Sequence, residues 1–326
     1  MPPSKNILIT GASGFIGPQL AARLLDDPQY RVILTDVVPP AVPAGVRHPE
    51  NATCIAADLC DASSLASLVA AAQPLAAAFV FHGIMSSGSE ADPALSMRVN
   101  LDATRGLLLH LSEHCRGVRV VYASSNAVYG PPLPEVVRPD SIPTPTGTYG
   151  AHKWMTEVFI NDLHRRGCID AFSLRFPSVS VRPGKPTAAA SSFLSGMIRE
   201  PMAGQECVIP IKDREFKATL CGPKTLVDNL LIVMNWKSDI LPSHIRGINI
   251  PGVIASVQAM MDALAKVGGE DKLKYIKEEP DETAERLLRS WAWNHDYSLP
   301  LKLGLKIDKD AESLVREYAE YVKAHQ

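Results

Sequence analysis

A tyrosine and a lysine in the middle of the chain have the types and spacing of a general-base pair. Tyr149 and Lys153 lie four positions apart in a helical pattern at 149–166, so their side chains are neighbours on one face of the predicted helix. A free tyrosine has a pKa of about 10 and is a poor base at neutral pH. A lysine ammonium beside it would stabilise the phenolate, and the tyrosine could then accept a proton from a substrate hydroxyl. Because this spacing often occurs by chance, the assignment depends on the surrounding elements.

A glycine-rich turn near the start of the chain has the form of a phosphate-binding loop. A predicted strand at 6–10 leads into Gly11, Gly14 and Gly17, and a helical pattern follows at 15–26. Glycines let the backbone turn tightly and approach a pyrophosphate, whose charge is met by the N–H groups and the dipole at the helix N-terminus. The residues expected to bind a dinucleotide here are Gly11, Ser13, Gly14, Phe15, Ile16 and Gly17.

Acidic residues follow the next two predicted strands. Asp36 ends the second strand, 19 residues after Gly17. A carboxylate at this position accepts hydrogen bonds from the ribose hydroxyls and repels a 2′-phosphate, which predicts NAD rather than NADP as the cofactor. Asp58 and Leu59 follow the third strand and are predicted to lie at the adenine edge.

Short apolar runs alternate with longer helical patterns through the first half of the chain. Continuous apolar strands separated by amphipathic helices predict a parallel sheet covered on both faces, which is a doubly wound α/β, or Rossmann, fold. Ligands bind such sheets at the carboxyl ends of the strands. The predicted strands are 6–10, 31–36, 53–57, 77–82, 119–124 and 171–176, and the predicted helices are 15–26, 62–72, 93–114 and 149–166.

The alternation changes after residue 176. A segment rich in Pro, Gly and Ser predicts a long loop at 177–190, and the later elements predict a smaller C-terminal lobe that binds the substrate. The nucleotide-binding domain is predicted to comprise 1–176 and 223–267, and the lobe to comprise 177–222 and 268–326. Further predicted elements are helices at 191–200, 256–267, 283–293 and 310–323 and strands at 207–211 and 247–250.

The composition predicts a globular protein of a reducing compartment. The 326 residues carry a net charge of -2, which argues against electrostatic binding to nucleic acid or to an anionic membrane. The chain has no signal-peptide pattern and no uninterrupted apolar run of about 18 residues, and its six cysteines are scattered. These features predict a cytoplasmic protein. We expect no metal site, because the H-x-x-E-H string at 110–114 lies at a helix end, far in sequence from a third ligand.

A serine completes a characteristic order of motifs. Ser125 follows the fifth predicted strand and lies between the glycine turn and the Tyr149-x-x-x-Lys153 pair. This order resembles the extended short-chain dehydrogenase/reductase family, which includes nucleotide-sugar epimerases and dehydratases, over residues 5–180. The resemblance implies that Ser125 hydrogen-bonds the reacting oxygen and that Tyr149 is the base. It also implies that Lys153 both tunes Tyr149 and holds the nicotinamide ribose.

The same resemblance implies further roles. Asn100 matches a family asparagine on the helix that faces the site, with a helix cap or a solvated amide as the alternative. In this family the long helices that correspond to 93–114 and 149–166 form a four-helix dimer interface, so we expect a homodimer. The cofactor contacts implied in addition to the glycine turn are Tyr149, Lys153 and Pro177.

Two departures from the family pattern narrow the reaction. Dehydratases carry an acidic pair directly after the catalytic residue, whereas this chain has Asn126 and Ala127, so dehydration is not expected. Nucleotide-sugar epimerases usually have an asparagine where this chain has Ser178, which puts a nucleotide-sugar substrate in doubt. The runs 82–88 and 175–201 resemble the D-erythronate dehydrogenase branch, whose members oxidise the C2 hydroxyl of a four-carbon sugar acid with NAD.

The resemblance therefore implies NAD-dependent oxidation of the C2 hydroxyl of a small sugar acid. Arg182 could anchor the carboxylate or could form a structural ion pair, and the serines could contact substrate or cap loops. Two alternatives stay open: an epimerase that retains NAD tightly, and a dinucleotide-sensing module without activity. The exact substrate, its stereochemistry and the physiological direction also stay open. The residues predicted to bind substrate are Ser86, Ser87, Ser125, Asn126, Tyr149, Arg182 and Ser192.

Overall fold

The chain forms two compact units. The computed structural model describes residues 5–184 and 190–324. Unit 1 comprises Met1–Val128, Gly147–Arg175 and Leu230–Ile248, and unit 2 comprises Tyr129–Thr146, Phe176–Asn229 and Asn249–Gln326. Compared with the predicted nucleotide-binding segments 1–176 and 223–267, unit 1 lacks residues 129–146, 176, 223–229 and 249–267, which belong to unit 2.

Unit 1 is built on a seven-stranded sheet with the order β10-β6-β5-β4-β1-β2-β3. The pairs β1–β2, β1–β4, β2–β3 and β4–β5 are parallel. Successive strands are added on one side of β1 as far as β3, and β4 then pairs on its other side, so the order reverses there. The predicted doubly wound parallel sheet is confirmed. Its strands are β1 (Lys5–Thr10), β2 (Tyr30–Asp36), β3 (Ala52–Ala56), β4 (Leu75–Val80), β5 (Arg119–Ser125), β6 (Asp170–Phe176) and β10 (Gly247–Asn249).

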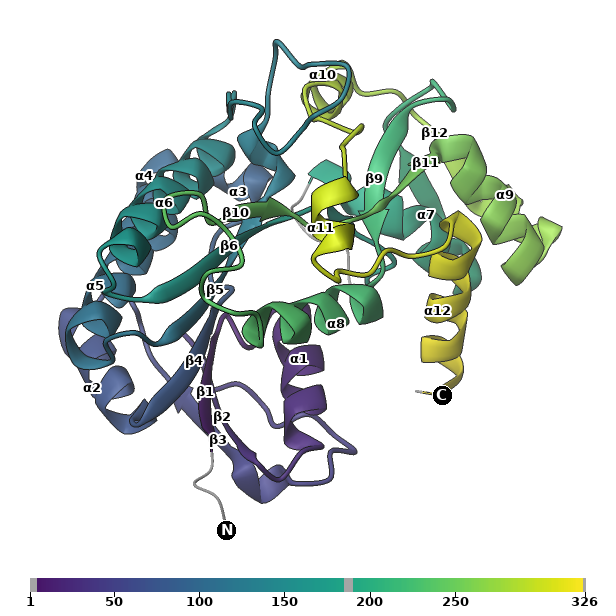
Figure 1. Cartoon of the computed structure of the whole chain (residues 1–326). Coiled ribbons are helices and arrows are strands. Elements are labelled where there is room, and N and C mark those ends of the chain that lie inside the picture. Colours follow the sequence, from purple (N-terminus) through teal and green to yellow (C-terminus); the bar gives the residue numbers. More distant parts are fainter. Residues whose placement is uncertain (1–4, 185–189, 325–326) are drawn as a thin grey trace. The chain divides into compact units, whose positions relative to one another are not determined.

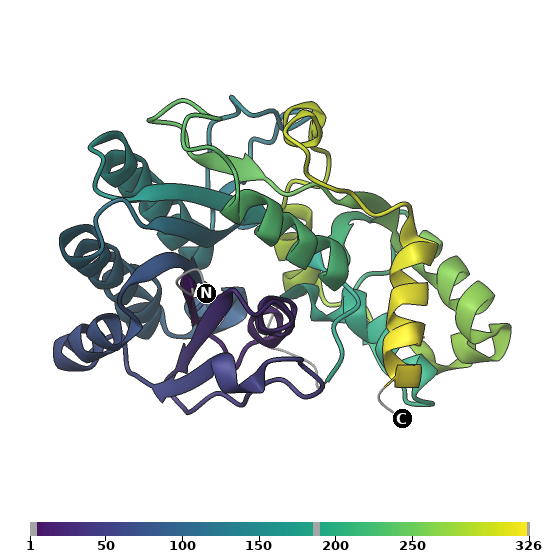
Figure 2. The same cartoon turned by 60° about the horizontal axis from the view of Figure 1, so that its bottom comes forward.

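Helices cover both faces of this sheet (Figure 1). α1 lies on one face and α2, α5 and α6 lie on the other, and the view in Figure 2 agrees. On the second face Leu8 and Val120 of the strands share a buried cluster with Leu65, Leu107 and Ile160 of the helices. Because both faces are covered, the strands are apolar in consecutive positions rather than in alternate ones. The helices are α1 (Ile16–Leu25), α2 (Ala62–Ala72), α3 (Ser86–Ala91), α4 (Pro93–Ser96), α5 (Thr104–His114) and α6 (Thr148–Arg165).

The helix predicted at 93–114 is not one regular α-helix. A π-helical segment at Met97–Ala103 joins α4 to α5. Wide turns of this kind are frequent at functional sites. Asn100 lies within the segment.

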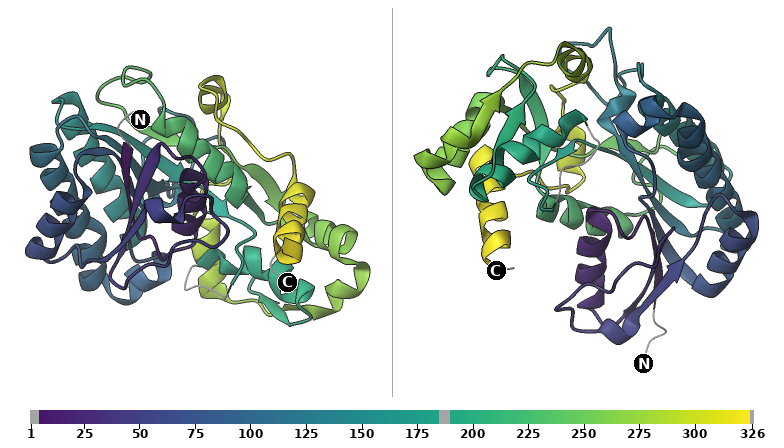
Figure 3. Two further views of the ribbon diagram at one scale, coloured as in Figure 1. Left: turned by 90° about the horizontal axis from the view of Figure 1, so that it is seen from below. Right: turned by 180° about the vertical axis from the view of Figure 1, so that it is seen from behind.

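Unit 2 has small sheets and a core of its own. Its three-stranded sheet has the order β11-β9-β7, with β9 and β11 antiparallel, and β8 pairs in parallel with β12. α9 and α12 pack side by side (Figure 3), and Met260 and Leu264 share a buried cluster with Leu314 and Val315. The predictions missed two helices, α8 (Pro223–Met234) and α11 (Ser298–Lys302), and four strands, β7 (Ser178–Val179), β9 (Lys217–Cys221), β11 (Val253–Ser256) and β12 (Ile276–Glu278). The other elements are α7 (Phe193–Met202), β8 (Cys207–Ile209), α9 (Val257–Gly268), α10 (Glu282–Arg289) and α12 (Ala311–Ala324).

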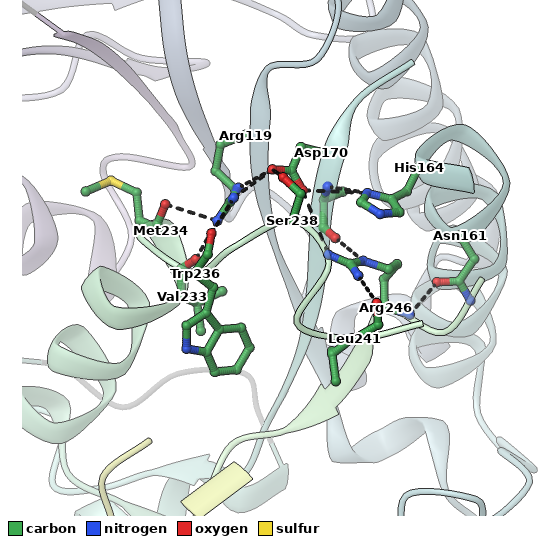
Figure 4. A network of polar contacts seen from close by, with 11 residues as sticks. Arg119, Asn161, His164, Asp170, Val233, Met234, Trp236, Ser238, Leu241 and Arg246 are labelled. Atoms are coloured by element: carbon green, nitrogen blue, oxygen red, sulfur yellow. Dashed lines mark hydrogen bonds and ion pairs between the residues drawn. The ribbon is translucent and has the colours of Figure 1, made fainter. Parts of the chain in front are cut away.

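A charge cluster holds the segment before β10 to the amino ends of β5 and β6 (Figure 4). The Asp170 carboxylate accepts hydrogen bonds from Arg119 Nη2 at 2.6 Å and from the Ser238 hydroxyl at 2.5 Å. Arg119 also donates to the carbonyl oxygens of Val233 and Trp236, at 2.8 and 2.7 Å. Asp170 is therefore the shared acceptor that joins two strands to the following segment, on the edge of the sheet opposite to the strand carboxyl ends.

A second arginine in this cluster is completely buried. Arg246 donates through Nε to the carbonyl of Ala171 and through Nη1 to that of Leu241, both at 2.9 Å. Its guanidinium lies 4.1 Å from the centroid of the Phe172 ring. Burial lowers the pKa of Arg246 to about 10, so the group is still charged at neutral pH. The Asp170 carboxylate, 3.8 Å from Arg246 Nη2, supplies the compensating negative charge.

Replacing Asp170 with Asn is expected to destabilise the protein by about 3 kcal/mol, because it leaves the buried Arg246 and the partly buried Arg119 without a counter-charge. Urea unfolding followed by circular dichroism measures the change. Asp239→Asn, an exposed change in the same segment, is the control and is expected to leave stability within about 0.5 kcal/mol. Equal unfolding midpoints for Asp170→Asn and the parent protein would contradict this account of the cluster.

Candidate active site

The glycine turn lies at the point where the strand order reverses. Thr10 ends β1, and Gly11 has a φ of 64°, in the left-handed region. A Cβ on Gly11 would lie 2.6 Å from the backbone nitrogen of His82, and a Cβ on Gly17 would lie 2.8 Å from Cα of Ala12. These glycines thus let the loop pass over the end of β4 and let α1 pack against the loop. The turn leaves the N-terminus of α1 directed at a site suited to a pyrophosphate.

Asp36 is held beside this turn. One of its carboxylate oxygens accepts a hydrogen bond from the backbone N–H of Ser13 at 3.0 Å, and the other accepts from that of Val37 at 2.8 Å. Since β1 and β2 are paired in register from Lys5–Tyr30 to Thr10–Thr35, the end of β2 lies next to the glycine turn. The structure thus places Asp36 where the sequence predicted it. Asp58 and Leu59 follow β3, and Asp58 accepts from the N–H of Cys60 at 2.9 Å.

Tyr149 and Lys153 meet on the first turns of α6. Lys153 is buried, and its Nζ donates to the carbonyl of Ala123 on β5 at 2.7 Å. The ammonium lies 5.4 Å from the centroid of the Tyr149 ring and 4.8 Å from that of Tyr122. Burial lowers the pKa of Lys153 to about 8, and the negative charge of Glu157 opposes this shift. Lys153 is therefore close to its titration point in the pH range where a tyrosine base would act.

Ser125 ends β5, two residues after the carbonyl that binds Lys153. Its Oγ accepts a hydrogen bond from the N–H of Ala127 at 3.1 Å, and its side chain is partly exposed. The hydroxyl proton can therefore be donated to a ligand oxygen. Ser125, Tyr149 and Lys153 come from the end of one strand and the start of one helix, and Lys153 ties the two elements together.

Asn100 is neither a helix cap nor a solvated amide. It is 2% exposed, and its amide binds the backbone of Ile84 at both ends: Oδ1 accepts from N–H at 2.6 Å and Nδ2 donates to the carbonyl at 3.0 Å. Nδ2 also donates to the hydroxyl of Ser96 at 3.1 Å, and Ser96 in turn contacts Nδ1 of His152 at 3.0 Å. In this structure Asn100 fastens the loop after β4 next to α6, and its catalytic role stays a prediction.

Two residues that the motifs did not assign also organise this site. His82 bridges two threonine hydroxyls, Thr10 through Nδ1 at 2.8 Å and Thr104 through Nε2 at 3.0 Å. Burial, with a smaller effect of Lys153, lowers the pKa of His82 to about 3, so the ring is neutral. Glu90 of α3 accepts from the N–H of Thr148 at 2.6 Å and so caps the helix that carries Tyr149. Only the long-range fold brings these partners together, and no local spacing indicates them.

The residues predicted to bind substrate fall in both units. Ser86 and Ser87 begin α3, and Asn126 is 8% exposed, with an Oδ1 that has no hydrogen-bond partner in the described part of the chain. In unit 2, Arg182 donates through Nε to the carbonyl of Val179 at 2.9 Å. Ser192 also belongs to unit 2, as does Pro177, which was predicted to contact the cofactor.

Within residues 5–184 and 190–324, no cluster of three His, Cys, Asp or Glu side chains could hold a metal ion. In the H-x-x-E-H string, the rings of His110 and His114 lie with their centroids 5.0 Å apart at the end of α5. None of the helices in these ranges is long and apolar enough to cross a membrane.

Comparison with known proteins finds a matching family model and relatives that are similar along almost the whole chain. A family model described as "NAD dependent epimerase/dehydratase family" matches residues 7–234. A D-erythronate dehydrogenase of Haemophilus influenzae is 35% identical over 318 residues, covering 97% of this chain and 99% of the relative. A D-erythronate dehydrogenase of Cupriavidus necator is 36% identical over 327 residues, covering 97% and 98%.

Solved structures share the fold along almost the whole chain. A crystal structure described as the nucleoside-diphosphate-sugar epimerase from Agrobacterium tumefaciens has a TM-score of 0.91 and 31% identity, and the match covers 99% of this chain and 96% of that one. The holo form of a GalE-like L-threonine dehydrogenase from Cupriavidus necator has a TM-score of 0.84 at 21% identity, covering 97% and 99%. At that level of identity the second likeness concerns the fold alone.

Proposed function

Because the chain belongs to the NAD-dependent epimerase/dehydratase family and is an NAD-dependent dehydrogenase of the extended short-chain type, we propose that it oxidises the C2 hydroxyl of a small sugar acid such as D-erythronate. The structural observation that carries the proposal is the buried Lys153 ammonium, 5.4 Å from the ring of Tyr149 and bound to the end of β5. This arrangement suits removal of a proton from a secondary hydroxyl.

The residues of unit 1 fit NAD. The two tight glycine positions shape the turn that leads to the N-terminus of α1, which is suited to a pyrophosphate, and Asp36 offers carboxylate oxygens to the adenosine ribose. Bound NAD supplies the hydride acceptor. In the proposed reaction Ser125 donates a hydrogen bond to the reacting oxygen, Tyr149 accepts the hydroxyl proton, and Lys153 stabilises the phenolate and binds the nicotinamide ribose.

The proposed substrate contacts are side chains that could bind the carboxylate and the hydroxyl groups of a small hydroxy acid. Arg182 is proposed to pair with the carboxylate, and Ser86, Ser87 and Ser192 to bind the hydroxyls. Asn126 and Ala127 replace the acidic pair of the dehydratases, so expulsion of a hydroxyl as water has no acid at that place in the sequence. The amide of Asn126 is proposed to bind substrate beside Ser125.

An activity screen tests the proposal. Purified enzyme is incubated with NAD and three- to six-carbon sugar acids, including D-erythronate and threonate, and NADH is followed by its absorbance. We expect NADH to accumulate with at least one of these acids. The epimerase named among the similar structures supports a second candidate, in which hydride returns to the opposite face of a keto intermediate. Tightly retained NAD with no net NADH for any acid would favour the epimerase and overturn the dehydrogenase.

We also propose a homodimer formed through α5 and α6. Apolar side chains are exposed along this surface, with Leu109 at 41%, Met155 at 42% and Val158 at 49%. A second copy of the chain would cover them. Light scattering at micromolar concentration is expected to give twice the monomer mass, and a monomer there would contradict the proposal.

The cytoplasm is the proposed location of the protein. The six cysteines are all free thiols, which suits a reducing compartment.

A further inference from the structure

A buried carboxylate lies one helical turn beyond Lys153. Glu157 of α6 is 1% exposed and is bound from two strands. Arg175 of β6 donates from Nη2 to Glu157 Oε2 at 2.7 Å and from Nε to Oε1 at 3.0 Å, and the hydroxyl of Ser124 on β5 donates to Oε1 at 2.5 Å. Gly247 of β10 makes room for the pair, since a Cβ there would lie 2.6 Å from Glu157 Oε2. These contacts fix Glu157 in one position and pair it with the guanidinium of Arg175.

Glu157 is connected to the two elements that carry the proposed catalytic residues, the end of β5 and the start of α6. Ser124, its hydrogen-bond partner, directly precedes Ser125. Lys153 lies four residues earlier on α6, so it is the neighbour of Glu157 on the same helix face. Within the proposed reaction neither Glu157 nor Arg175 touches substrate or NAD, and their burial still costs free energy.

Glu157 is the carboxylate whose charge raises the pKa of Lys153. Burial raises the pKa of Tyr122 on β5, and His82 after β4 is neutral. His152 precedes Lys153 on α6, and burial lowers its pKa. Among the described residues, the other charged or titratable groups that face Lys153 are Tyr149 and Glu157 of α6, with Arg175 of β6 beyond Glu157.

We propose that Glu157 is a positioning residue for hydride transfer: its fixed charge keeps Lys153 in the ammonium form, and its bond to Ser124 holds the end of β5 in place. A buried ammonium is disfavoured by the loss of water, and a nearby carboxylate in a medium of low dielectric restores it. Arg175 holds the carboxylate in place but also reduces its effect on Lys153. The inference rests on the proposed function in one respect, the position of Lys153 beside the nicotinamide.

The protonation of Lys153 can be measured by cofactor binding without turnover. A Lys153 ammonium repels the positively charged nicotinamide of NAD⁺ more than the neutral ring of NADH. The ratio of the Kd for NAD⁺ to the Kd for NADH therefore falls as Lys153 loses its proton. Measuring this ratio from pH 6 to 10 in the Tyr149→Phe background removes the titration of Tyr149. The midpoint of the fall reports the pKa of Lys153.

In this background Glu157→Gln is expected to move the midpoint to lower pH by at least about one unit, because Lys153 loses its counter-charge. Ser124→Ala is the matched control. It removes a contact of the same carboxylate but keeps the charge, so the midpoint should stay in place. Arg175→Gln removes the opposing positive charge and is expected to move the midpoint to higher pH.

The outcomes separate the two proposals. Shifts in opposite directions for Glu157→Gln and Arg175→Gln support the role of Glu157, and a folded Glu157→Gln enzyme with an unmoved midpoint overturns that role alone. If Glu157→Gln does not fold, the upward shift of Arg175→Gln decides, and its absence overturns the inference. A ratio that does not change with pH in Tyr149→Phe itself overturns both the inference and the proposed position of Lys153 beside the nicotinamide.

Discussion

Replacing Tyr149 with Phe is expected to lower kcat by about 1,000-fold and to change the Kd for NADH by less than about twofold. Phenylalanine keeps the ring that lies 5.4 Å from the Lys153 ammonium, so the packing of α6 against β5 stays. The substitution removes only the hydroxyl that would accept the substrate proton. Initial rates of NADH formation and fluorescence titration with NADH measure the two quantities. A Tyr149→Phe enzyme with the wild-type rate would end the assignment of Tyr149 as the base.

Tyr122 offers a matched control for this substitution. Its ring also lies against Lys153, with the ammonium 4.8 Å from the ring centroid, but the residue is fully buried within β5. Burial raises the pKa of Tyr122, which makes it unsuitable as a base at neutral pH. Because its hydroxyl takes no proton in the proposed reaction, Tyr122→Phe is expected to keep kcat within about threefold. The loss of this buried hydroxyl should lower stability by at most about 1–2 kcal/mol, so the variant stays folded. Similar losses of kcat in both variants would show that the effect comes from packing around Lys153.

Sequence patterns located those parts of the site that are local in the chain. Gly11 directly follows β1 and Asp36 ends β2, and the alternation of strands with helices predicts that these strand ends share one edge of the sheet. Helical spacing predicts that Tyr149 and Lys153 are neighbours on one face of a helix. Each of these inferences uses residues within one strand, one turn or one helix, and this is why it needed no knowledge of the packing.

The supporting contacts could not be found in this way because they join distant segments. Ser124 is 33 positions from Glu157, and Glu90 is 58 positions from Thr148. Glu157 had one local signal, an acid four residues after Lys153 on a helix face that the fold buries, but such a pair usually reads as a solvated salt bridge. The helix predicted at 256–267, which is α9, was assigned to the nucleotide-binding domain, but it lies in unit 2 and follows β11, which pairs with β9. Local periodicity predicts a helix or a strand, but it does not show which other element packs against it.

Gly11 is the second position at which a single change should have a large effect. Gly11→Ala is expected to weaken NADH binding roughly 100-fold and to destabilise the protein by about 3 kcal/mol. The new Cβ would lie 2.6 Å from the backbone nitrogen of His82 and 2.8 Å from the carbonyl carbon of Phe81, and neither atom can move without disturbing the end of β4. The left-handed φ of 64° adds about 1–2 kcal/mol of strain for alanine.

Gly45→Ala separates these two causes. Gly45 also has a left-handed φ, of 75°, but a Cβ there would meet no atom within 4 Å. It should therefore show the backbone strain alone, about 1 kcal/mol in urea unfolding, with NADH binding unchanged. Gly11→Ala could lose no more stability than Gly45→Ala and still bind NADH as tightly as the parent enzyme. That result would show that the phosphate site does not depend on the close approach of the loop to the end of β4. A larger loss confined to Gly11 locates that requirement in the contact with His82, the same residue that joins Thr10 to Thr104 beside Lys153.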